Sequence, residues 1–238
     1  MKKIVLSLLC LVLLFVTDTY AKKVKGDGKV VTQIRNVSSF EKIEVSGVFN
    51  IILEQGETEK IKIETDQNLL EYVITEVVNN KLKIYTPDDI TIEDPKKGNI
   101  YITIKDINEI SMEGVGNIKT SGQIKVPGLK IYNVGVGSVD VDVVTDVLNV
   151  NFEGVGSCNL SGNTKNLDIK SSGLGGVDAK KLTADIVSVE NSSVGNISVY
   201  ARKELSLDNS GIGNITYYGD AEIKSLNDSG IGKIKKGK

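Results

Sequence analysis

Residues 135–156 read GVGSVDVDVVTDVLNVNFEGVG, and this stretch decides the fold that we expect. It begins and ends with a Gly-Val-Gly triplet, and apolar and polar residues alternate on both sides of each triplet. Alternation with a period of two is typical of a β-strand that has one buried face. Glycine tolerates positive φ and close backbone approach, so we interpret the triplets as sharp corners between strands.

The same unit recurs throughout the second half of the chain. Seven triplets start 21, 19, 19, 20, 18 and 19 residues apart, from Gly114 to Gly230, and they hold 13 of the 24 glycines. We expect the alternation to slip at each triplet so that its aliphatic middle residue stays inward. These middle residues are Val115, Val136, Val155, Leu174, Val194, Ile212 and Ile231.

A unit of about 19 residues cannot bury its own apolar face, whereas stacked copies bury a continuous aliphatic column. The short, β-branched segments broken by glycine disfavour helices. We therefore predict an all-β fold, a parallel β-helix or β-solenoid with Gly-x-Gly repeats. A propeller or a sandwich, built from pairs of units, is the alternative.

Asparagine recurs at two places beside the triplets. Stacked Asn side chains form amide ladders along a solenoid, so we favour a structural role over a sugar-binding row. The two sets are Asn117, Asn196 and Asn214, and Asn133, Asn191 and Asn209.

The N-terminal half is less regular. We expect residues 22–35 to be an extended lead-in and residues 36–238 to form a single solenoid domain. Within this domain, residues 36–110 are predicted to form irregular β coils and residues 111–236 the regular repeats.

Two segments of this half allow a more detailed prediction. Phe40 to Glu54 resembles one coil of the repeat, with Phe49 in place of the second glycine. Asn68 to Val78 is compatible with a short helix or a bent strand. Its β-branched and aromatic residues favour the strand.

Residues 1–21 have the layout of a cleaved signal peptide. Lys2 and Lys3 precede an apolar run from Ile4 to Val16, which is shorter than the about 20 residues needed to span a bilayer. Ala21 ends a small-residue cleavage site. Cys10 follows Leu9 and lies inside the apolar run, so lipidation is not expected. These features predict export to the periplasm, the outer cell envelope or the extracellular space, with no stable membrane span.

Composition excludes several functions. The chain has no His, so a Ser-His-Asp triad, a Cys-His pair and a His-ligated zinc are ruled out. The net charge of −2 argues against a nucleic-acid partner, which would require a basic stripe. Cleavage of the signal peptide leaves Cys158 alone, in an aliphatic column where a buried thiol is expected.

The motifs that could carry chemistry have structural explanations. The glycine triplets are followed by strands, whereas a dinucleotide-binding loop needs a helix. Residues 135–143 resemble a calcium-binding nonapeptide, but the period here is 19. β-Helical enzymes use paired carboxylates, and the pairs available are Asp140 with Asp142 and Asp178 with Asp185.

Two further features lie near the C-terminus. Tyr217 and Tyr218 could offer a stacking platform for sugars, with Tyr218 as the more exposed of the two. Four lysines lie among the last six residues, where they would protect the end of the solenoid from pairing with another chain. From the residues alone we assign no catalytic, cofactor, metal or ligand-binding residue.

The order of these features resembles the head GIN domain family of auto-transporter adhesins, which is common in exported proteins of Bacteroidetes-type bacteria. The resemblance covers about 36–236. It rests on Arg35-Asn36-Val37, on the segment Phe40 to Gly47, on Asn79 to Ile84, and on turns such as Ser210 to Ile215. It implies a β-helical exported protein with no assigned enzymatic activity and no catalytic motif.

Three hypotheses for the function follow. The first is a non-catalytic, adhesin-like module of the cell envelope that binds a glycan or a surface protein. The second is a carbohydrate-active enzyme that cleaves polysaccharides. The third is a purely structural envelope component that forms homo-oligomers through its faces or ends. We favour the first and expect no enzymatic activity and no cofactor.

Export makes the first testable prediction. We expect protein recovered after export to begin at Lys22, because Thr19 and Ala21 supply the small residues that signal peptidase requires. Intact mass and N-terminal sequencing measure this directly. Ala21→Leu should block cleavage and retain residues 1–21. An exported chain that starts at Met1, or that carries lipid on Cys10, would contradict the prediction.

Overall fold

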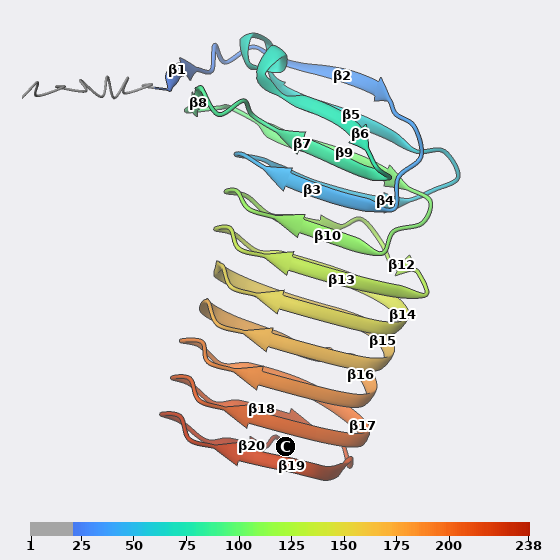
Figure 1. The fold of residues 1–238 in the computed structure, drawn as a ribbon, viewed down its shortest axis with the longest axis vertical. Coiled ribbons are helices and arrows are strands. Elements are labelled where there is room, and N and C mark those ends of the chain that lie inside the picture. The colour runs from blue at the N-terminus through green and yellow to red at the C-terminus, as the bar shows by residue number, and fades with distance from the viewer. Residues whose placement is uncertain (1–20) are drawn as a thin grey trace, which may run out of the picture.

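The computed structural model describes residues 21–238 and is a β-solenoid (Figure 1). Strands make up 67% of it and helix 3%, and about seven turns stack with a spacing close to 19 residues. The predicted fold class is therefore confirmed. Within residues 21–238 no helix is long and apolar enough to cross a membrane. The expected signal peptide lies outside the described residues, except for Ala21.

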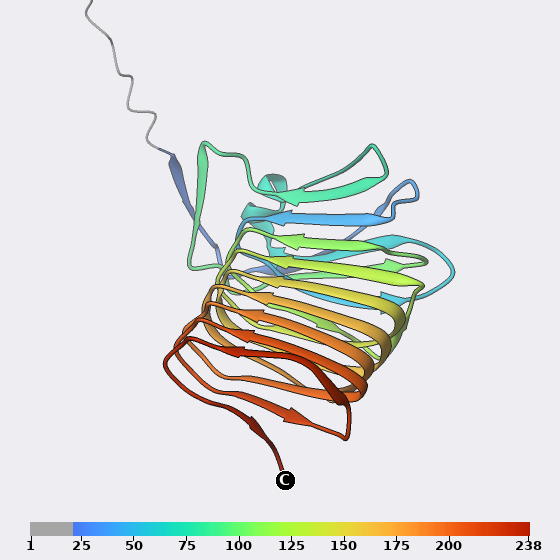
Figure 2. The ribbon, with the colours of Figure 1, turned by 60° about the horizontal axis from the view of Figure 1, so that its bottom comes forward.

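Each coil of the solenoid has two long sides, and Figure 2 views the stack obliquely along its axis, with the strands of both sides running across the picture. Side A contains β7 (Lys81–Tyr85), β3 (Lys42–Ser46), β10 (Glu109–Met112), β13 (Gly128–Asn133), the second halves of β14 (Val139–Phe152), β15 (Val155–Ser171), β16 (Leu174–Asn191) and β17 (Ile197–Asn209), and β19 (Glu222–Asp228). Side B contains β9 (Gly98–Ile104), β4 (Asn50–Gln55), β11 (Ile118–Thr120), the first halves of β14 to β17, β18 (Ile215–Tyr218) and β20 (Ile234–Lys236). β12 (Ile124–Lys125) lies between the sides.

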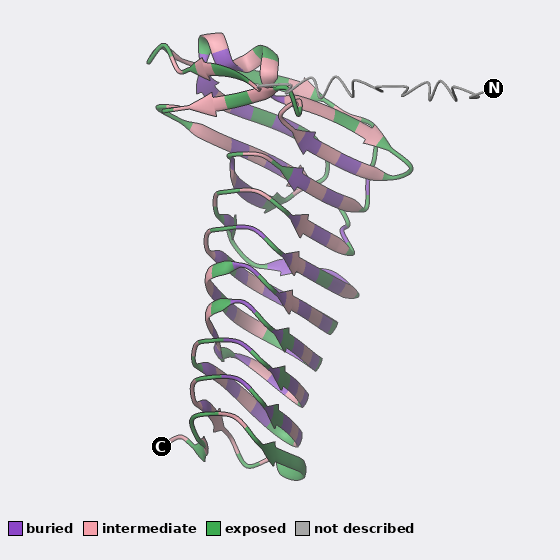
Figure 3. Ribbon diagram, turned by 60° about the vertical axis from the view of Figure 1, so that its left-hand side comes forward, coloured by how far each residue is buried: buried purple, intermediate pink, exposed green. Residues whose placement is uncertain are grey.

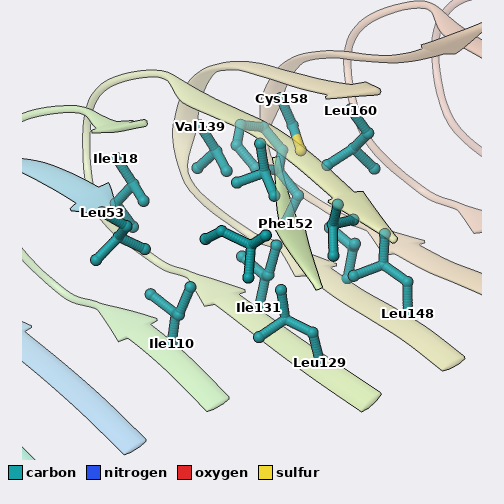
Figure 4. Packing of buried hydrophobic residues seen from close by; sticks show 14 of the residues in the cluster. Leu53, Ile110, Ile118, Leu129, Ile131, Val139, Leu148, Phe152, Cys158 and Leu160 are labelled. Carbon is teal, nitrogen blue, oxygen red and sulfur yellow. The ribbon is translucent and has the colours of Figure 1, made fainter. Parts of the chain in front are cut away.

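The core lies between the two sides and is filled by the aliphatic columns of the repeat (Figure 4). Parallel pairing keeps these columns in register: Val139 pairs with Cys158, and Phe152 pairs with Ser171. Phe152 is completely buried and is one of the largest side chains of the core. Because each coil covers the inward residues of its neighbours, burial is continuous from coil to coil as far as Ile215, whereas β19 in the last coil is exposed.

The triplets form one edge of the solenoid, on the left in Figure 1, and they differ from our expectation in one respect. Their middle residues are exposed, from 45% at Val155 to 72% at Ile231, so the predicted inward orientation is wrong. The alternation does not slip at the corner. Counted along the chain, both glycines lie an even number of residues from the buried core positions. The residue between them therefore lies on the outer face. A Cβ at Gly137 would overlap the carbonyl oxygen of Gly116 in the neighbouring coil, and so glycine is needed there.

The N-terminal coils do not stack in the order of the sequence. The coil formed by β3 and β4 lies in the middle: it pairs with β10 and β11 on one side and with β7 and β9 on the other. Phe40 to Glu54 therefore forms a coil, as predicted, and its Val48 pairs with Val115 of the next corner. The coil that comes next in the sequence, formed by β7 and β9, lies between this coil and the N-terminal end of the stack.

Antiparallel strands close this end of the stack, at the top in Figure 1. On side B, β5 (Lys60–Asp66) pairs with β9, and β2 (Val30–Asn36) pairs with β5. On side A, β6 (Ile74–Val78) pairs with β7 through a turn at Asn79 and Asn80, which both have positive φ as a two-residue hairpin requires. Our expectation of irregular coils did not include these antiparallel pairs.

Two N-terminal segments differ in detail from the sequence predictions. Residues 22–35 are extended, and they also pair with the body: β1 (Lys22–Lys25) with β8 (Ile90–Glu93), and β2 with β5. In the segment 68–78, the predicted strand is wrong for the first part, which lies in a 3-10 helix, η1 (Gln67–Tyr72), and right for β6. η1 buries Leu69 while it carries the chain from side B to side A, which a continuous strand could not do.

The glycine corners provide a stability prediction. Gly137 has φ of +145° and no room for a Cβ, so we expect Gly137→Ala to lower the free energy of unfolding by about 3 kcal/mol or more. Gly128→Ala is the matched control, because a Cβ there meets only an ordinary contact at 3.8 Å. Urea unfolding measures both. Equal stabilities of the two variants would show that the corner does not need glycine.

Candidate functional site

Outward side chains of four neighbouring strands on side B form the most structured polar surface of the solenoid. The strands are β5, β9, β4 and β11, and their register places the side chains in two rows. We call the eight residues the Tyr101 surface. The first row is Glu64, Asn99, Asn50 and Asn117, and the second row is Lys62, Tyr101, Ile52 and Lys119.

The first row is an amide ladder that ends on a carboxylate. Asn117 donates to the Asn50 Oδ1 atom at 3.0 Å, and Asn50 donates to the Asn99 Oδ1 atom at 3.3 Å. Asn99 in turn donates to Glu64 at 3.3 Å. Each amide has more donor and acceptor sites than one ladder bond uses. The ladder therefore holds the side chains in place and still presents hydrogen-bonding groups to solvent.

Tyr101 is fixed at the centre of the second row. Its hydroxyl donates to Glu64 at 3.3 Å, and the Lys62 ammonium lies 3.8 Å from the ring centroid. The hydrogen bond from Lys97, together with those from Asn99 and Tyr101, lowers the pKa of Glu64 below its ordinary value. Glu64 is therefore a stable anion that anchors both rows.

The surface is hollowed beside these rows. A depression of about 550 Å³ is lined by residues of β4, β9 and the β11 corner, including Asn50, Asn99, Tyr101, Asn117 and Lys119. Its floor includes Ile52, which is 8% exposed. Amides, one lysine and an aromatic ring beside an aliphatic floor suit a ligand that has both hydroxyl groups and apolar faces.

The carboxylates singled out from the sequence do not form acid–base pairs. Asp140 accepts a hydrogen bond from Asn159 at 2.6 Å, and Asp142 accepts one from Gln123 at 3.0 Å. Both groups thus belong to surface hydrogen bonds between coils.

The second predicted pair is divided between different partners. Asp178 forms an ion pair with Lys180 at 3.1 Å. Asp185 interacts with Lys203 and Arg202, and the hydrogen bond from Lys203 is the main cause that lowers the pKa of Asp185. A depressed pKa is the opposite of what a general acid needs.

Within residues 21–238 one carboxyl group has a raised pKa, and no pattern in the sequence singled it out. Partial burial, reinforced by the negative charge of Glu190, raises the pKa of Asp168 on side A, and Lys170 opposes the shift. Lys170 pairs with Glu190 at 3.1 Å, so this cluster has the geometry of a surface ion network. Within residues 21–238 no group of three carboxylate or thiol side chains is placed to hold a metal ion.

The remaining candidates lie near the C-terminal end. Tyr217 packs partly against the core. Tyr218 is half-buried, and its ring lies against Gly237, so it is not a free stacking platform. Of the C-terminal lysines, Lys235 and Lys236 lie in β20, an edge strand, and Lys236 pairs with Asp220 at 2.8 Å.

Both predicted Asn sets form ladders, one outside and one inside. Outside, Asn214 donates to the Asn196 Oδ1 atom at 3.3 Å. Inside, buried Asn191 donates to Asn209 at 2.8 Å, and Asn209 donates to Asp228 at 2.9 Å. The predicted structural role is confirmed for Asn191, Asn209, Asn196 and Asn214, and Asn117 joins a separate ladder with Asn50. Asn133 is an exception, because its buried Nδ2 atom has no hydrogen-bond partner.

A family model described as "Putative auto-transporter adhesin, head GIN domain" matches residues 39–221. The chain belongs to this family. The resemblance drawn from the sequence is thus confirmed. The match covers the solenoid as far as residue 221, without β19 and β20, and it includes the antiparallel strands β5 and β6 but not β2. A search of curated proteins finds no match to this head GIN domain chain.

Solved structures share the fold of this head GIN domain. A putative adhesin from Bacteroides fragilis is 30% identical, with a TM-score of 0.87 over 90% of this chain and 99% of that one. A protein described as a putative lipid binding protein from Parabacteroides distasonis is 26% identical, with a TM-score of 0.75 over 91% and 100%. A putative adhesin from Parabacteroides merdae, 23% identical with a TM-score of 0.66, supports the fold alone. None of these names is that of an enzyme.

Sequence reasoning missed the Tyr101 surface because its residues come from four strands with mixed directions. Asn50 and Asn99 are 49 residues apart, and Asn50 and Asn117 are 67 apart. Glu64 and Lys62 join them through antiparallel pairing of β5, which the 19-residue period does not describe. The one available signal was the coil-like pattern of Phe40 to Glu54, which aligns Asn50 with Asn117.

Cys158 lies in the core of this head GIN domain, as predicted, and it gives a clear chemical test (Figure 4). Burial, with a smaller effect of the Asp140 charge, raises the pKa of its thiol to about 12. We expect a thiol reagent at neutral pH to modify the folded chain at least about 100-fold more slowly than the chain in urea. Cys10→Ser removes the other thiol from the measurement. Rapid labelling of the folded chain would contradict the buried position.

Proposed function

We propose that this protein is an exported, non-catalytic, adhesin-like module of the cell envelope that binds glycans through the Tyr101 surface. Family membership supports an adhesin-like role, and the signal peptide expected in residues 1–21 supports export. The observation that carries the proposal is the pair of rows in which an amide ladder runs beside a fixed tyrosine and an aliphatic floor.

The chemistry of the two rows suits a sugar. The apolar face of a sugar ring can pack on Tyr101 and Ile52, and its hydroxyl groups can exchange hydrogen bonds with Asn50 and Asn117. Lys119 is exposed at the edge of the hollow and would favour a carboxylate or sulfate substituent. We therefore propose an acidic glycan as the preferred ligand.

The ladder also makes the surface rigid. Asn50 and Asn99 are half-buried and bonded to each other, and Tyr101 is held by Glu64 and Lys62. Side chains that are already ordered lose little conformational entropy on binding. A shallow hollow with few contacts can then bind a glycan with measurable affinity. Several such contacts between two cell surfaces add avidity.

A glycan array followed by titration tests the proposal. The double variant Tyr101→Ala/Asn117→Ala should weaken binding of acidic glycans at least about tenfold, since each lost contact is worth about 1 kcal/mol. The matched control is Tyr218→Ala/Asn214→Ala, which removes the same residue types from side B outside the hollow. It should bind within about twofold of the unmodified protein.

Three results would reject the proposal. One is an array without any bound glycan, and another is an equal loss of binding in the two double variants. The third is turnover: cleavage of a polysaccharide that is abolished by Asp168→Asn would assign the protein to the carbohydrate-active enzymes.

A further inference from the structure

The exposed middle residues of the corners form a continuous line that we call the aliphatic ridge. Each one pairs with its counterpart in the next coil, so the line extends from the first corner to the last. With strands about 4.8 Å apart, it is roughly 34 Å long. The corner edge is turned forward in Figure 3. The residues are Val48, Val115, Val136, Val155, Leu174, Val194, Ile212 and Ile231, with exposures from 39% to 72%.

Exposure at these positions does not require an aliphatic residue. The outward column four residues further on is polar in seven of the eight coils: Lys119, Asp140, Asn159, Asp178, Ser198, Thr216 and Lys235. In the coil of Val48 the same position is Ile52, which is 8% exposed. Stacking between coils does not account for the ridge either, because Ile231 has a neighbour on one side only and remains aliphatic. An uninterrupted line of exposed aliphatic side chains indicates a contact with an apolar phase.

The residues beside the ridge are small and carry few charges. On one side, the last four coils present Ser172, Ser192, Ser210 and Ser229, and on the other side Gly176, Asn196 and Asn214 precede Lys233. Glu113 and Glu153 flank the earlier coils. At the N-terminal end of the ridge, Lys96 and Lys97 line one depression with Val48 and Val115. Recognition of an anionic lipid surface uses clusters of about four to eight Lys and Arg, which is more than this pair supplies.

The shape of the ridge distinguishes a lipid surface from a protein partner. A half-exposed aliphatic side chain leaves roughly 50 Å² to bury, so the ridge offers on the order of 400 Å², about half of what one partner buries in a stable protein interface. A protein would also need a groove of the same length to receive a convex line one residue wide. A bilayer deforms around such a line without any complementary shape.

We propose that the aliphatic ridge is a peripheral contact site for a surface of zwitterionic phospholipid. The ridge side chains enter the boundary between headgroups and acyl chains, and the flanking Ser and Asn side chains remain at headgroup depth. The sheets of sides A and B are then roughly perpendicular to the membrane plane. Asn50 and Asn117 of the Tyr101 surface share the flanking column with Asn196 and Asn214 and so lie at headgroup depth, whereas the second row, with Tyr101, lies two residues further from the ridge on side B.

Flotation of the exported protein with phosphatidylcholine vesicles tests this site. The ridge variant carries Val115→Thr, Val136→Thr, Val155→Thr and Val194→Thr, which keep the side-chain shape and add hydroxyl groups. The control variant carries Ile34→Thr, Val78→Thr, Val147→Thr and Ile186→Thr, at positions that are 39–65% exposed elsewhere. The ridge variant should partition to vesicles at least about tenfold less than the unmodified protein, and the control within about twofold.

Salt and lipid composition provide independent readouts. Binding through an uncharged ridge should change little between low and high salt, and it should not increase when anionic lipid is added. Unfolding midpoints of both variants show whether the fold is kept. The proposal is overturned if the unmodified protein does not float, if both variants lose binding equally, or if binding needs anionic lipid. A concentration-dependent dimer that the ridge variant abolishes, without vesicle binding, would assign the ridge to a second copy instead.

Discussion

Neighbouring backbones approach closely at the corners, and this close approach makes the stacking of the coils possible. At Gly137 and Gly156, the space that a Cβ would occupy is filled by a carbonyl oxygen of the preceding coil. This contact allows the strands on both sides of the corner to pair residue for residue with the next coil. Continuous pairing then stacks the aliphatic columns and the Asn ladders. Packing, polar satisfaction and the aliphatic ridge all follow from it.

The antiparallel strands at the N-terminal end have a second role beyond covering the stack. By adding β5 beside β9, they place Glu64 and Lys62 next to a parallel sheet whose own repeat contains neither. The Tyr101 surface arises where the two pairing schemes meet. The regular coils repeat the same residue types, whereas the antiparallel strand β5 adds a carboxylate and a second lysine beside them. The Tyr101 surface therefore lies next to the antiparallel strands.

The period, the parallel stacking and the core columns could be predicted from the sequence because every repeat contains the same local information. The orientation of the ridge could also have been derived. The core columns lie an even number of residues from the first glycine of each triplet, whereas Val155 lies one residue after Gly154 and so faces outward. The order of the first coils could not, because the pairing of β3 with both β7 and β10 depends on competition among similar strands. The Tyr101 surface was missed for the same reason, since residues as distant as Asn50 and Asn99 meet only through that order.

The position of the earliest coil in the middle of its neighbours has a consequence for how the chain folds. Its pairing with β9 and with the next corner joins residues 49 and 67 apart, whereas later coils join residues about 19 apart. Loop closure is therefore most costly at the start, and each later coil adds to an existing template at a small, constant cost. The N-terminal region therefore acts as the foundation on which the later coils stack.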